Sequence, residues 1–309
     1  MGVLGTGLYS RDFALDLRSA VGAVLRLPFD PDKLVDALSG TEPSAANKSS
    51  DEDHTTFWLV IADQFARRGI ACDRVRTKAL AIIDTGIDIA MLEKLGMKAN
   101  ELRKRQRILD EVRARIVGAP TTNKPRTVLQ KPEPLLMEIG DVLAYPTCSG
   151  ENINPYRPSR AANIHYTKTG REPWKQDGWG AMVILDCGRA FEYLAWYRPA
   201  KLAEAMAEKP TLDSLRSEML WSIESPGTCS PSHFRKMELE KIGVFSVDRE
   251  KANVIYPKRF GTGASAAVQD ISIANRMKAA LPGTALPNPR GEKKYYTPTL
   301  SGIEEVLSL

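Results

Sequence analysis

The interval at which apolar residues recur changes once along this chain, and that change limits the folds available to it. Up to residue 118 the apolar side chains recur every three or four positions, which is the period of an amphipathic helix. A polar stretch without that period follows, punctuated by four prolines: Pro120, Pro125, Pro132 and Pro134. Beyond it, short alternating or wholly apolar runs indicate β-strands. The order of these patterns predicts an α+β protein.

The change of period also predicts where the domains divide. At 309 residues the chain is long for a single domain. We expect an all-α helical domain over residues 1–118 and a proline-containing linker over residues 119–135. A small, bent antiparallel β-sheet or barrel with helical insertions should occupy residues 136–281. Residues 282–309 should form a mostly flexible tail.

Glycines, prolines and capping residues divide the helical pattern of the first domain. Asp30 and Pro31 supply an N-cap and a first-turn proline, and Asp53 is expected to cap the helix that stops before Gly69. The polar residues 42–53 are predicted to form a loop. The expected helices are residues 11–27, 31–38, the segment from Asp53 to Gly69, 73–86, a short helix ending at Gly96, and 99–117.

The second domain is predicted to be built on short strands. Residues 181–185 are wholly apolar, as in a strand that is covered on both faces. Residues 186–189 (Asp-Cys-Gly-Arg) predict the turn into a hairpin partner at residues 190–198. Other expected strands are residues 141–146, 161–167, 241–247 and 252–256, and helical insertions are expected at residues 212–220, 231–237 and 268–281.

Composition bears on the compartment of the protein. The cysteines stand far apart and form no C-x-x-C pair, which favours a reduced environment. The longest apolar run, residues 57–62, is far shorter than the roughly 20 residues that a membrane helix needs. Residues 1–20 lack the regions of a signal peptide. The net charge of +5 permits anionic partners without requiring them. We therefore expect a cytoplasmic protein with no membrane contact.

The opening residues combine two glycines with two aspartates. The Gly5-Thr6-Gly7 turn precedes a helix, as a phosphate cradle does, but it has no following Gly-Lys-Ser/Thr and Asp12 would repel a phosphate. Asp12 and Asp16 lie four residues apart on one helix face, where like charges repel. We predict that the turn docks the first helix, and that Asp12 and Asp16 are held by arginines of this chain or of a partner.

Residues 82–88 (Ile-Ile-Asp-Thr-Gly-Ile-Asp) resemble the active-site signature of retroviral-type aspartic proteases. In those enzymes two such aspartates share a proton. The signature requires a strand before it, whereas here a helical pattern precedes it over residues 74–83. Asp84 is therefore interpreted more simply as a helix cap, and a hydrolase that uses Asp84 remains an alternative.

Other catalytic patterns are incomplete. Cys229 and His233 have the spacing of a zinc-binding pair, which Cys148 or His165 would have to complete, but no second close pair exists. The chain also lacks a Gly-x-Ser-x-Gly motif, and Cys187 has no evident base. We accordingly assign no catalytic residue, no metal and no cofactor.

Two basic segments suggest a nucleic-acid partner. Residues 103–107 carry four basic side chains, but acidic residues interleave with them, as on a solvated helix face. Residues 293–296 (Lys-Lys-Tyr-Tyr) combine charge with rings that can stack on bases. Nucleic-acid binding therefore stays open as an alternative function.

Aromatic residues crowd one stretch of the second domain. Tryptophan, tyrosine and arginine are the residues that most often anchor protein interfaces. Trp179 and Trp196 can equally be core residues, so the preferred contact patch is a partly exposed Trp174 with Tyr156 and Arg198. The full set of predicted partner-binding residues is Tyr156, Trp174, Trp179, Trp196, Tyr197, Arg198, Asp12 and Asp16.

Each half also resembles a known family. Gly5 to Tyr9, with the acidic helix after it, is similar to a bacterial domain of unknown function that opens with a Trp-Gly-x-Gly turn; Leu4 stands in place of the tryptophan. Residues 140–146, 188–191 and 230–234 are similar to immunity domains of bacterial polymorphic toxin systems. The second resemblance implies a domain that binds and blocks a toxin. We therefore expect a cytosolic bacterial protein-binding protein, an immunity protein, and not an enzyme.

Overall fold

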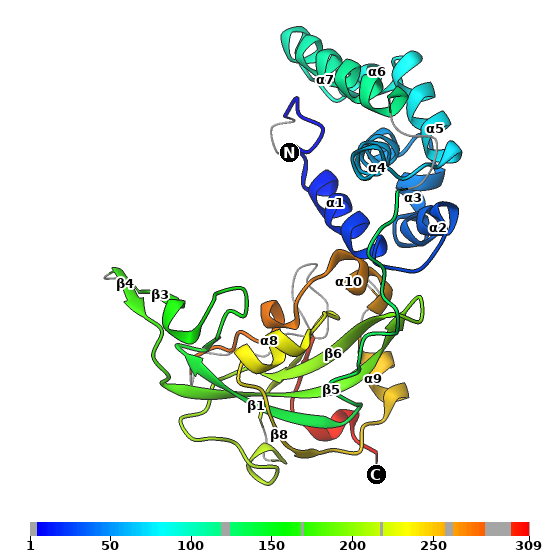
Figure 1. Cartoon of the computed structure of the whole chain (residues 1–309). Helices are drawn as coiled ribbons and strands as arrows, with labels where there is room; N and C mark the ends of the chain where they lie inside the picture. Colours follow the sequence, from blue (N-terminus) through cyan, green and yellow to red (C-terminus); the bar gives the residue numbers. More distant parts are fainter. Residues whose placement is uncertain are drawn as a thin grey trace. The chain divides into compact units, whose positions relative to one another are not determined.

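The structure is a computed structural model that describes residues 5–118, 124–167, 170–216, 219–256, 262–281 and 298–308. It divides into two compact units, Met1–Lys131 and Pro132–Leu309. The division falls inside the range predicted as the linker. Figure 1 shows that the described helices of the first unit precede an antiparallel sheet in the second, so the mixed α+β class is confirmed.

The first unit is built from helices that surround α4 (His54–Arg68). Every residue of α4 from Thr55 to Phe65 is buried, and the helix ends at Gly69 in the left-handed conformation with φ of 66°. That conformation favours glycine. The other helices are α1 (Asp12–Val24), α2 (Pro31–Thr41), α3 (Pro43–Asn47), α5 (Asp73–Asp84), α6 (Ile87–Lys94) and α7 (Ala99–Val117).

Two expectations for this unit are wrong. The stretch predicted as a loop contains α3, which begins at Pro43 and buries Ala45 and Ala46. Asp53 precedes α4 with helical backbone angles, and its carboxylate forms an ion pair with Arg11 at 3.2 Å instead of capping the helix. In both cases a tertiary contact decides what the local composition left open.

Part of the predicted linker belongs to the first unit. The guanidinium group of Arg126 donates hydrogen bonds to the carbonyls of Leu25, Leu27 and Phe29, at the end of α1. The backbone N–H of Leu129 donates to the carbonyl of Arg26 at 2.7 Å. Residues 124–129 therefore satisfy carbonyl groups that the end of a helix leaves without partners.

The second unit is organised around an antiparallel sheet. Among the described residues the sheet has seven strands in the order β2-β1-β5-β6-β7-β9, and β8 pairs with β1. A separate two-stranded sheet is formed by β3 (Ile164–Thr167) and β4 (Gly170–Pro173). The strands of the large sheet are β1 (Asp141–Cys148), β2 (Glu151–Asn152), β5 (Gly178–Ala190), β6 (Leu194–Leu202), β7 (Trp221–Ile223), β8 (Glu240–Val244) and β9 (Thr299–Leu300).

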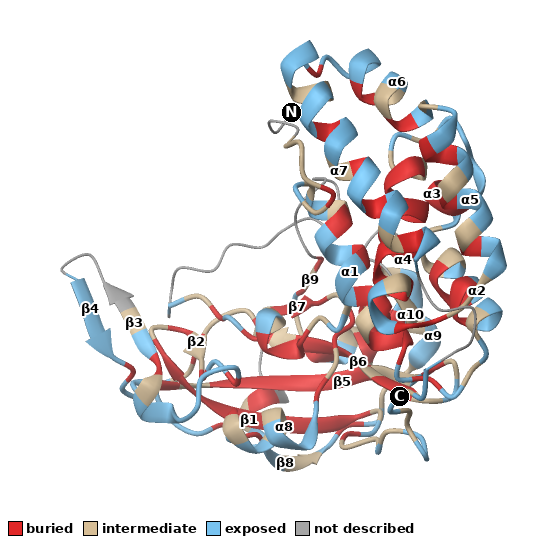
Figure 2. Cartoon of the chain, turned by 45° about the horizontal axis from the view of Figure 1, so that its top comes forward, coloured by how far each residue is buried: buried red, intermediate tan, exposed pale blue. Residues whose placement is uncertain are grey.

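The central strands of this sheet are buried on both faces, as Figure 2 shows for β1, β5 and β6. One face packs Leu185, Ala200 and Trp221 against residues of the chain end, including Ile303 and Val306. The opposite face packs Tyr145, Ile184 and Tyr197 against Met237 and Ile273. The helices of this unit are α8 (Pro231–Lys236), α9 (Arg249–Ile255) and α10 (Gly263–Gln269). Successive side chains alternate between faces, so a wholly apolar run fits a doubly covered strand.

The predicted turn at residues 186–189 is wrong. Strand β5 continues through it to Ala190, and the chain reverses at Phe191 and Glu192, which have φ of 53° and 66°. An irregularity in the β5–β6 pairing between Ile184 and Asp186 keeps the strand paired across the polar stretch. A β-bulge of this kind accommodates residues that otherwise favour a turn.

Three further assignments in this unit need correction. Residues 252–256, predicted as a strand, lie mostly in α9, because the Asp248 side chain accepts hydrogen bonds from the N–H groups of Glu250 and Lys251. The helix predicted over 212–220 is reduced to a 3-10 turn at Ser214–Arg216. The helix predicted over 268–281 is replaced by the end of α10 and a 3-10 turn at Ile273–Arg276. Of the predicted tail, residues 298–308 contribute β9 and buried side chains, and residues 282–297 lie outside the described ranges.

Candidate functional site

The predicted aromatic contact residues separate into buried and exposed groups. Tyr197 and Arg198 are 0% and 5% exposed, and Trp174, expected to be partly exposed, is only 8% exposed. Tyr156 is 58% exposed. The expected patch of Trp174, Tyr156 and Arg198 is therefore wrong in its exposure, and Tyr156 alone of the three presents a ring to solvent.

The burial of Trp174 has a clear cause. Its indole packs with Cys148 and Ile153 in a small apolar cluster, and its N–H donates to the carbonyl of Glu151 at 3.3 Å. The guanidinium of Arg160 covers the ring at 4.7 Å from the centroid. Trp174 thus anchors the base of the β3–β4 sheet.

The remaining aromatic residues also serve the fold. The Tyr197 hydroxyl accepts a hydrogen bond from the N–H of Leu136 at 2.8 Å inside the core. Trp196 is partly buried against Gly188 and Gly263, where a Cβ on either glycine would crowd the indole. Trp179 is partly buried, with the ammonium of Lys209 5.4 Å from the ring centroid.

Tyr156 is displayed by a loop that is held at several points. The Asn154 side chain accepts from the N–H of Tyr156 at 2.9 Å, and the Asn163 side chain accepts from the N–H of Asn154 at 2.8 Å. The ammonium of Lys236 on α8 donates to the carbonyls of Pro155 and Arg157, each at 3.1 Å. These contacts fix the backbone on both sides of the exposed ring.

The side chain of Tyr156 is held as well. Its ring meets the His233 ring edge-to-face, with 4.8 Å between centroids and 72° between planes. Partial burial, with the nearby charge of Asp270, raises the pKa of Tyr156. The hydroxyl therefore stays protonated at neutral pH.

His233 and Asp270 complete this surface. His233 lies in the first turn of α8, where the Ser230 hydroxyl accepts from its N–H at 3.1 Å. Burial lowers the pKa of His233, and the charge of Asp270 opposes that shift. The carboxylate of Asp270 accepts a hydrogen bond from the Thr228 hydroxyl at 3.1 Å. We call Tyr156, Thr228, His233 and Asp270 the Tyr156 surface.

The Tyr156 surface is suited to contact more than to catalysis. It combines an aromatic ring, a neutral imidazole, hydroxyl groups and one carboxylate on a fixed frame. Ser272 is the nearest candidate nucleophile, but it is fully buried and its hydroxyl accepts a hydrogen bond from the N–H of Ala274 at 3.2 Å. A nucleophile must be reached by substrate, so this serine is structural.

The β3–β4 sheet follows the Tyr156 loop along the chain. Its two strands pair with each other, and within the described residues no further strand joins them (Figure 1). Ile164 is 49% exposed and every residue of β4 is exposed. A two-stranded sheet is marginally stable in water without further packing. An exposed hairpin with an apolar side chain is therefore a surface that a partner would stabilise.

The arginine clamp expected at Asp12 and Asp16 is found elsewhere. Both aspartates are exposed, and neither forms an ion pair with any residue in the described ranges. The clamped carboxylate is instead Asp63 on α4, which is fully buried and contacts the guanidinium groups of Arg67, at 2.7 Å, and Arg115.

Tyr9 explains the opening Gly-x-Gly turn. Its hydroxyl donates to the Asp63 carboxylate at 2.5 Å and accepts from the Gln64 amide. The guanidinium of Arg18 lies over its ring at 5.3 Å. Burial, with the hydrogen bond to Asp63, raises the pKa of Tyr9 to about 12. The sequence shows Tyr9 only as part of the opening motif, and nothing near it in the chain predicts its contact with the buried Asp63.

A second buried pair removes one residue from the basic run on α7. Arg105 is 4% exposed, and its guanidinium contacts both oxygens of Asp88 at 2.8 and 3.1 Å. The Thr55 hydroxyl donates to the same carboxylate at 2.9 Å. Arg103, Lys104 and Arg107 remain exposed. Arg105 lies on the apolar stripe that includes Leu109 and Val112, and that position in the sequence was the signal that its side chain is buried.

Asp84 occupies the last position of α5 and is half exposed, so its interpretation as the cap of the next helix is wrong: Gly86 is the N-cap of α6. The Asp84 carboxylate forms an ion pair with Arg113 at 2.8 Å. The preceding residues are helical, and α6 follows directly. This arrangement lacks the strand that an aspartic-protease signature requires, so Asp84 carries no further argument for hydrolysis.

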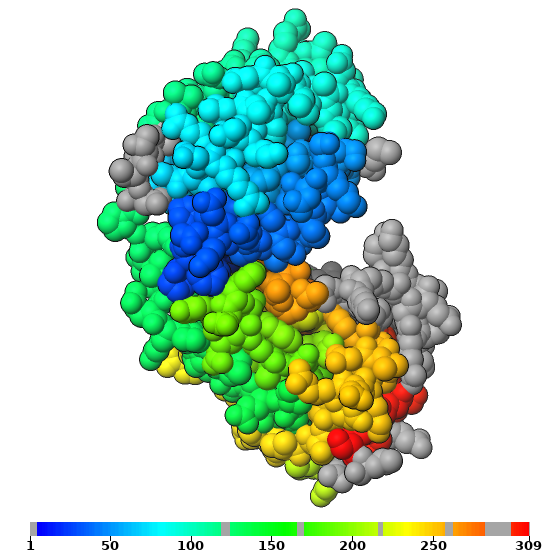
Figure 3. Space-filling model, turned by 90° about the vertical axis from the view of Figure 1, so that its right-hand side faces the viewer, coloured from blue at the N-terminus to red at the C-terminus, as the bar shows by residue number. Residues whose placement is uncertain are grey.

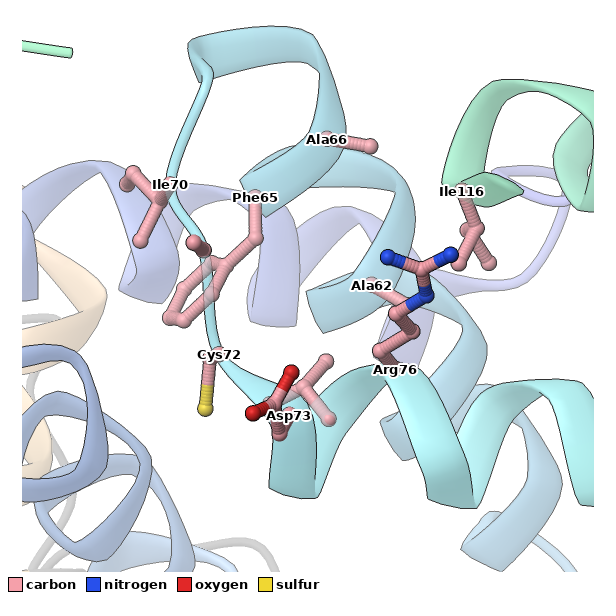
Figure 4. Close-up of a pocket in the computed structure, with 10 residues that line it drawn as sticks. Ala62, Phe65, Ala66, Ile70, Cys72, Asp73, Arg76 and Ile116 are labelled. Carbon is pink, nitrogen blue, oxygen red and sulfur yellow. The ribbon is translucent and has the colours of Figure 1, made fainter. Parts of the chain in front are cut away.

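A small hollow in the first unit lies between α4, α5 and the end of α7. Figure 4 shows Phe65, Ile70 and Ile116 around it, with Cys72 and Arg76 at its rim. Burial raises the pKa of the Cys72 thiol, and the thiol donates to Asp32 at 3.6 Å. A protonated thiol is a weak nucleophile, so the hollow carries no reactive group.

A metal site, a membrane-spanning helix or a related protein would each narrow the function of this chain. Within the described ranges, no group of three or more histidine, cysteine or acidic side chains is arranged to hold a metal ion. No helix of the described part is both long and apolar enough to cross a bilayer. Comparison of the chain with family models, with curated proteins and with solved structures found no significant match. The segment Lys293–Tyr296 lies outside the described residues.

Proposed function

We propose that this chain is a protein-binding protein and that its second unit contacts the partner through the Tyr156 surface and the β3–β4 sheet. The observation that carries the proposal is Tyr156, an aromatic ring 58% exposed on a loop held from both sides. Rigid tyrosines lose little conformational entropy on binding and recur as interface hot spots. The exposed Ile164 on β3 would add apolar contact area.

The kind of partner follows from the sequence resemblance. Immunity domains of toxin systems bind and block a toxin without catalysis, and the matching residues 230–234 include His233 of the Tyr156 surface. We therefore propose that the partner is a bacterial protein toxin and that binding neutralises it. We also propose that the chain acts in the cytoplasm and that its second unit is a small bent sheet of the immunity type.

The test starts from the genes that neighbour this one and uses as the partner a toxin-like protein that they encode. Binding of the two purified full-length proteins is measured by isothermal titration calorimetry, and neutralisation by growth of cells that express the toxin. Wild type should bind and protect. Tyr156→Ala should weaken binding by about 30-fold or more, the range of an interface hot spot.

A matched control separates contact from general damage. Val254 on α9 is 86% exposed in the same unit, so Val254→Asp should bind and protect as wild type does. The proposal fails if wild type does not bind the toxin, or if Val254→Asp and Tyr156→Ala weaken binding equally. Binding to nucleic acid that falls steeply with salt would instead support the alternative function.

A further inference from the structure

A second polar cluster lies in the same unit, on the sheet face that α9 contacts (Figure 1). Asp186 on β5 and Arg198 on β6 are paired across the two strands, directly after the irregularity between Ile184 and Asp186. Arg249 and Asn253 reach it from α9. We call Asp186, Arg198, Arg249 and Asn253 the Arg198 cluster.

The charges of this cluster do not balance. The Asp186 carboxylate contacts Arg249 at 2.7 Å and Arg198 at 3.6 Å, so two guanidinium groups share one carboxylate. The third polar partner, the Asn253 amide oxygen, accepts from Arg198 at 2.7 Å and is neutral. The carboxylate balances the guanidinium of Arg198, which is 7% exposed, and the second positive charge lies on Arg249, which is 57% exposed. The cluster as a whole is therefore net positive, and a net positive group of donors attracts an anion to its rim.

One donor of Arg198 is also unused. Its Nε–H is buried and has no hydrogen-bond partner among the residues that the structure describes. Tyr256 lies under the guanidinium plane at 4.7 Å, so the ring holds the plane without accepting its edge. A buried unsatisfied donor in a folded protein points to a water or an ion that occupies the position. The excess charge favours an anion over a water.

We propose that the Arg198 cluster binds an oxyanion, the phosphate or carboxylate group of a small ligand. The edge of Arg198 offers a planar donor pair of the kind that matches two oxygens of such a group. Arg249, which is 57% exposed, adds a second donor group at the rim. Asp186 keeps both guanidinium groups oriented. This site is separate from the Tyr156 surface and does not depend on the protein-binding proposal.

The approach to the site runs along α9. Asn253 is exposed and Val254 is 86% exposed, and the segment that contains them forms part of the surface in Figure 3, in yellow to orange. A ligand that carries an oxyanion next to an apolar group would meet both features. Entry requires a local movement of the Arg198 side chain, because its Nε is covered.

The test measures anion binding to the full-length chain. Thermal unfolding and isothermal titration calorimetry are run with inorganic phosphate, with acetate and with chloride at equal ionic strength. Phosphate or acetate should raise the melting temperature in a concentration-dependent way that chloride does not match. The oxyanion that binds more tightly identifies the ligand class as phosphate or carboxylate.

Two variants place the binding at this cluster. Arg249→Gln removes an exposed guanidinium and should weaken the preferred oxyanion about tenfold, since a hydrogen bond to a charged group contributes at least that factor. Arg198→Lys keeps the charge but removes the Nε–H and should weaken it by more. Arg160→Gln is the matched control, because Arg160 forms an ion pair with Glu238 elsewhere in the unit.

Three results would overturn the proposal. The first is an equal response of wild type to chloride and to both oxyanions, as expected if a water occupies the position. The second is equal weakening by Arg160→Gln and Arg249→Gln. The third is unchanged binding in Arg249→Gln. If Arg198→Lys does not fold, the comparison of Arg249→Gln with Arg160→Gln still decides the matter.

Discussion

The two units differ in how completely one of their buried charged groups is hydrogen-bonded. In the described part of the first unit, each deeply buried carboxylate is hydrogen-bonded by several donors. Asp63 contacts Tyr9, Arg67 and Arg115. Asp88 contacts the hydroxyl of Thr55 and the Nε and Nη2 atoms of Arg105. In the second unit Arg198 is nearly as buried but lacks a full set of partners. The comparison indicates that the first unit uses buried charge to hold its helices together, whereas the second leaves a charged group available.

The largest expected effect comes from breaking a matched pair. Asp88→Ala leaves the buried Arg105 without its counter-ion, so the free energy of unfolding should fall by about 3–5 kcal/mol. Urea denaturation followed by circular dichroism measures it. Asp84→Ala removes an ion pair that is half exposed and should cost about 0–1 kcal/mol. Equal losses in the two variants would show that Asp88 is not a structural clamp.

A smaller effect is expected when one donor is removed from Asp63. Tyr9→Phe deletes the hydroxyl that donates to Asp63 but leaves both arginines, so the free energy of unfolding should fall by about 1–3 kcal/mol. The same denaturation experiment applies, and Tyr156→Phe, at an exposed tyrosine of the second unit, serves for comparison. A loss no larger than that of Tyr156→Phe would contradict the docking role of Tyr9.

Alkaline pH should weaken both units through buried tyrosines. Burial raises the pKa values of Tyr9, Tyr197 and Tyr256 to about 12, above the value of about 10 for an unfolded tyrosine. Their contribution to stability is therefore complete below pH ~10 and is lost as pH rises towards ~12. Urea midpoints measured across this range, with tyrosinate absorbance, check it. A constant midpoint would refute the prediction.

The smallest effect on stability should come from the exposed β3–β4 sheet. Ile164→Asp places a charge on a side chain that is already 49% exposed, so the free energy of unfolding should change by less than about 0.5 kcal/mol. Toxin binding by the same variant should nevertheless weaken at least about tenfold. A large loss of stability would instead assign Ile164 to the core of the second unit.

Local chemistry allowed much of the helical unit to be predicted. The predicted bounds of α7 agree with the structure at both ends, and Asp30 caps α2 through the N–H of Lys33 as expected. These features depend on residues close together in the sequence. The end of α4 at Gly69 belongs to the same class.

Features that depend on distant partners could not be predicted in the same way. The Asp12 and Asp16 spacing is visible in the sequence, yet the clamped residue is Asp63, whose partner Arg115 is 52 residues away. Residues 186–189 have turn composition, but their pairing with β6 keeps them in a strand. Trp174 was expected at the surface, but the guanidinium of Arg160 covers its ring. This contact forms only in the folded chain and has no signal in the sequence around Trp174. Tyr156 was chosen as a contact residue by its residue type, and its exposure fits its place in a loop between strands, where side chains commonly face solvent.

The contact between Arg126 and the end of α1 has a consequence for synthesis of the chain. Helix α1 leaves the ribosome early, but the carbonyl of Leu25 receives its guanidinium donor from a residue 101 positions later. Until that residue emerges, the carbonyl groups of Leu25, Leu27 and Phe29, which follow α1, lack their guanidinium donor and depend on water. A fragment ended at residue 118, where the helical pattern stops, would leave these carbonyl groups without that donor permanently. Expression of the helical unit alone should therefore extend past residue 129.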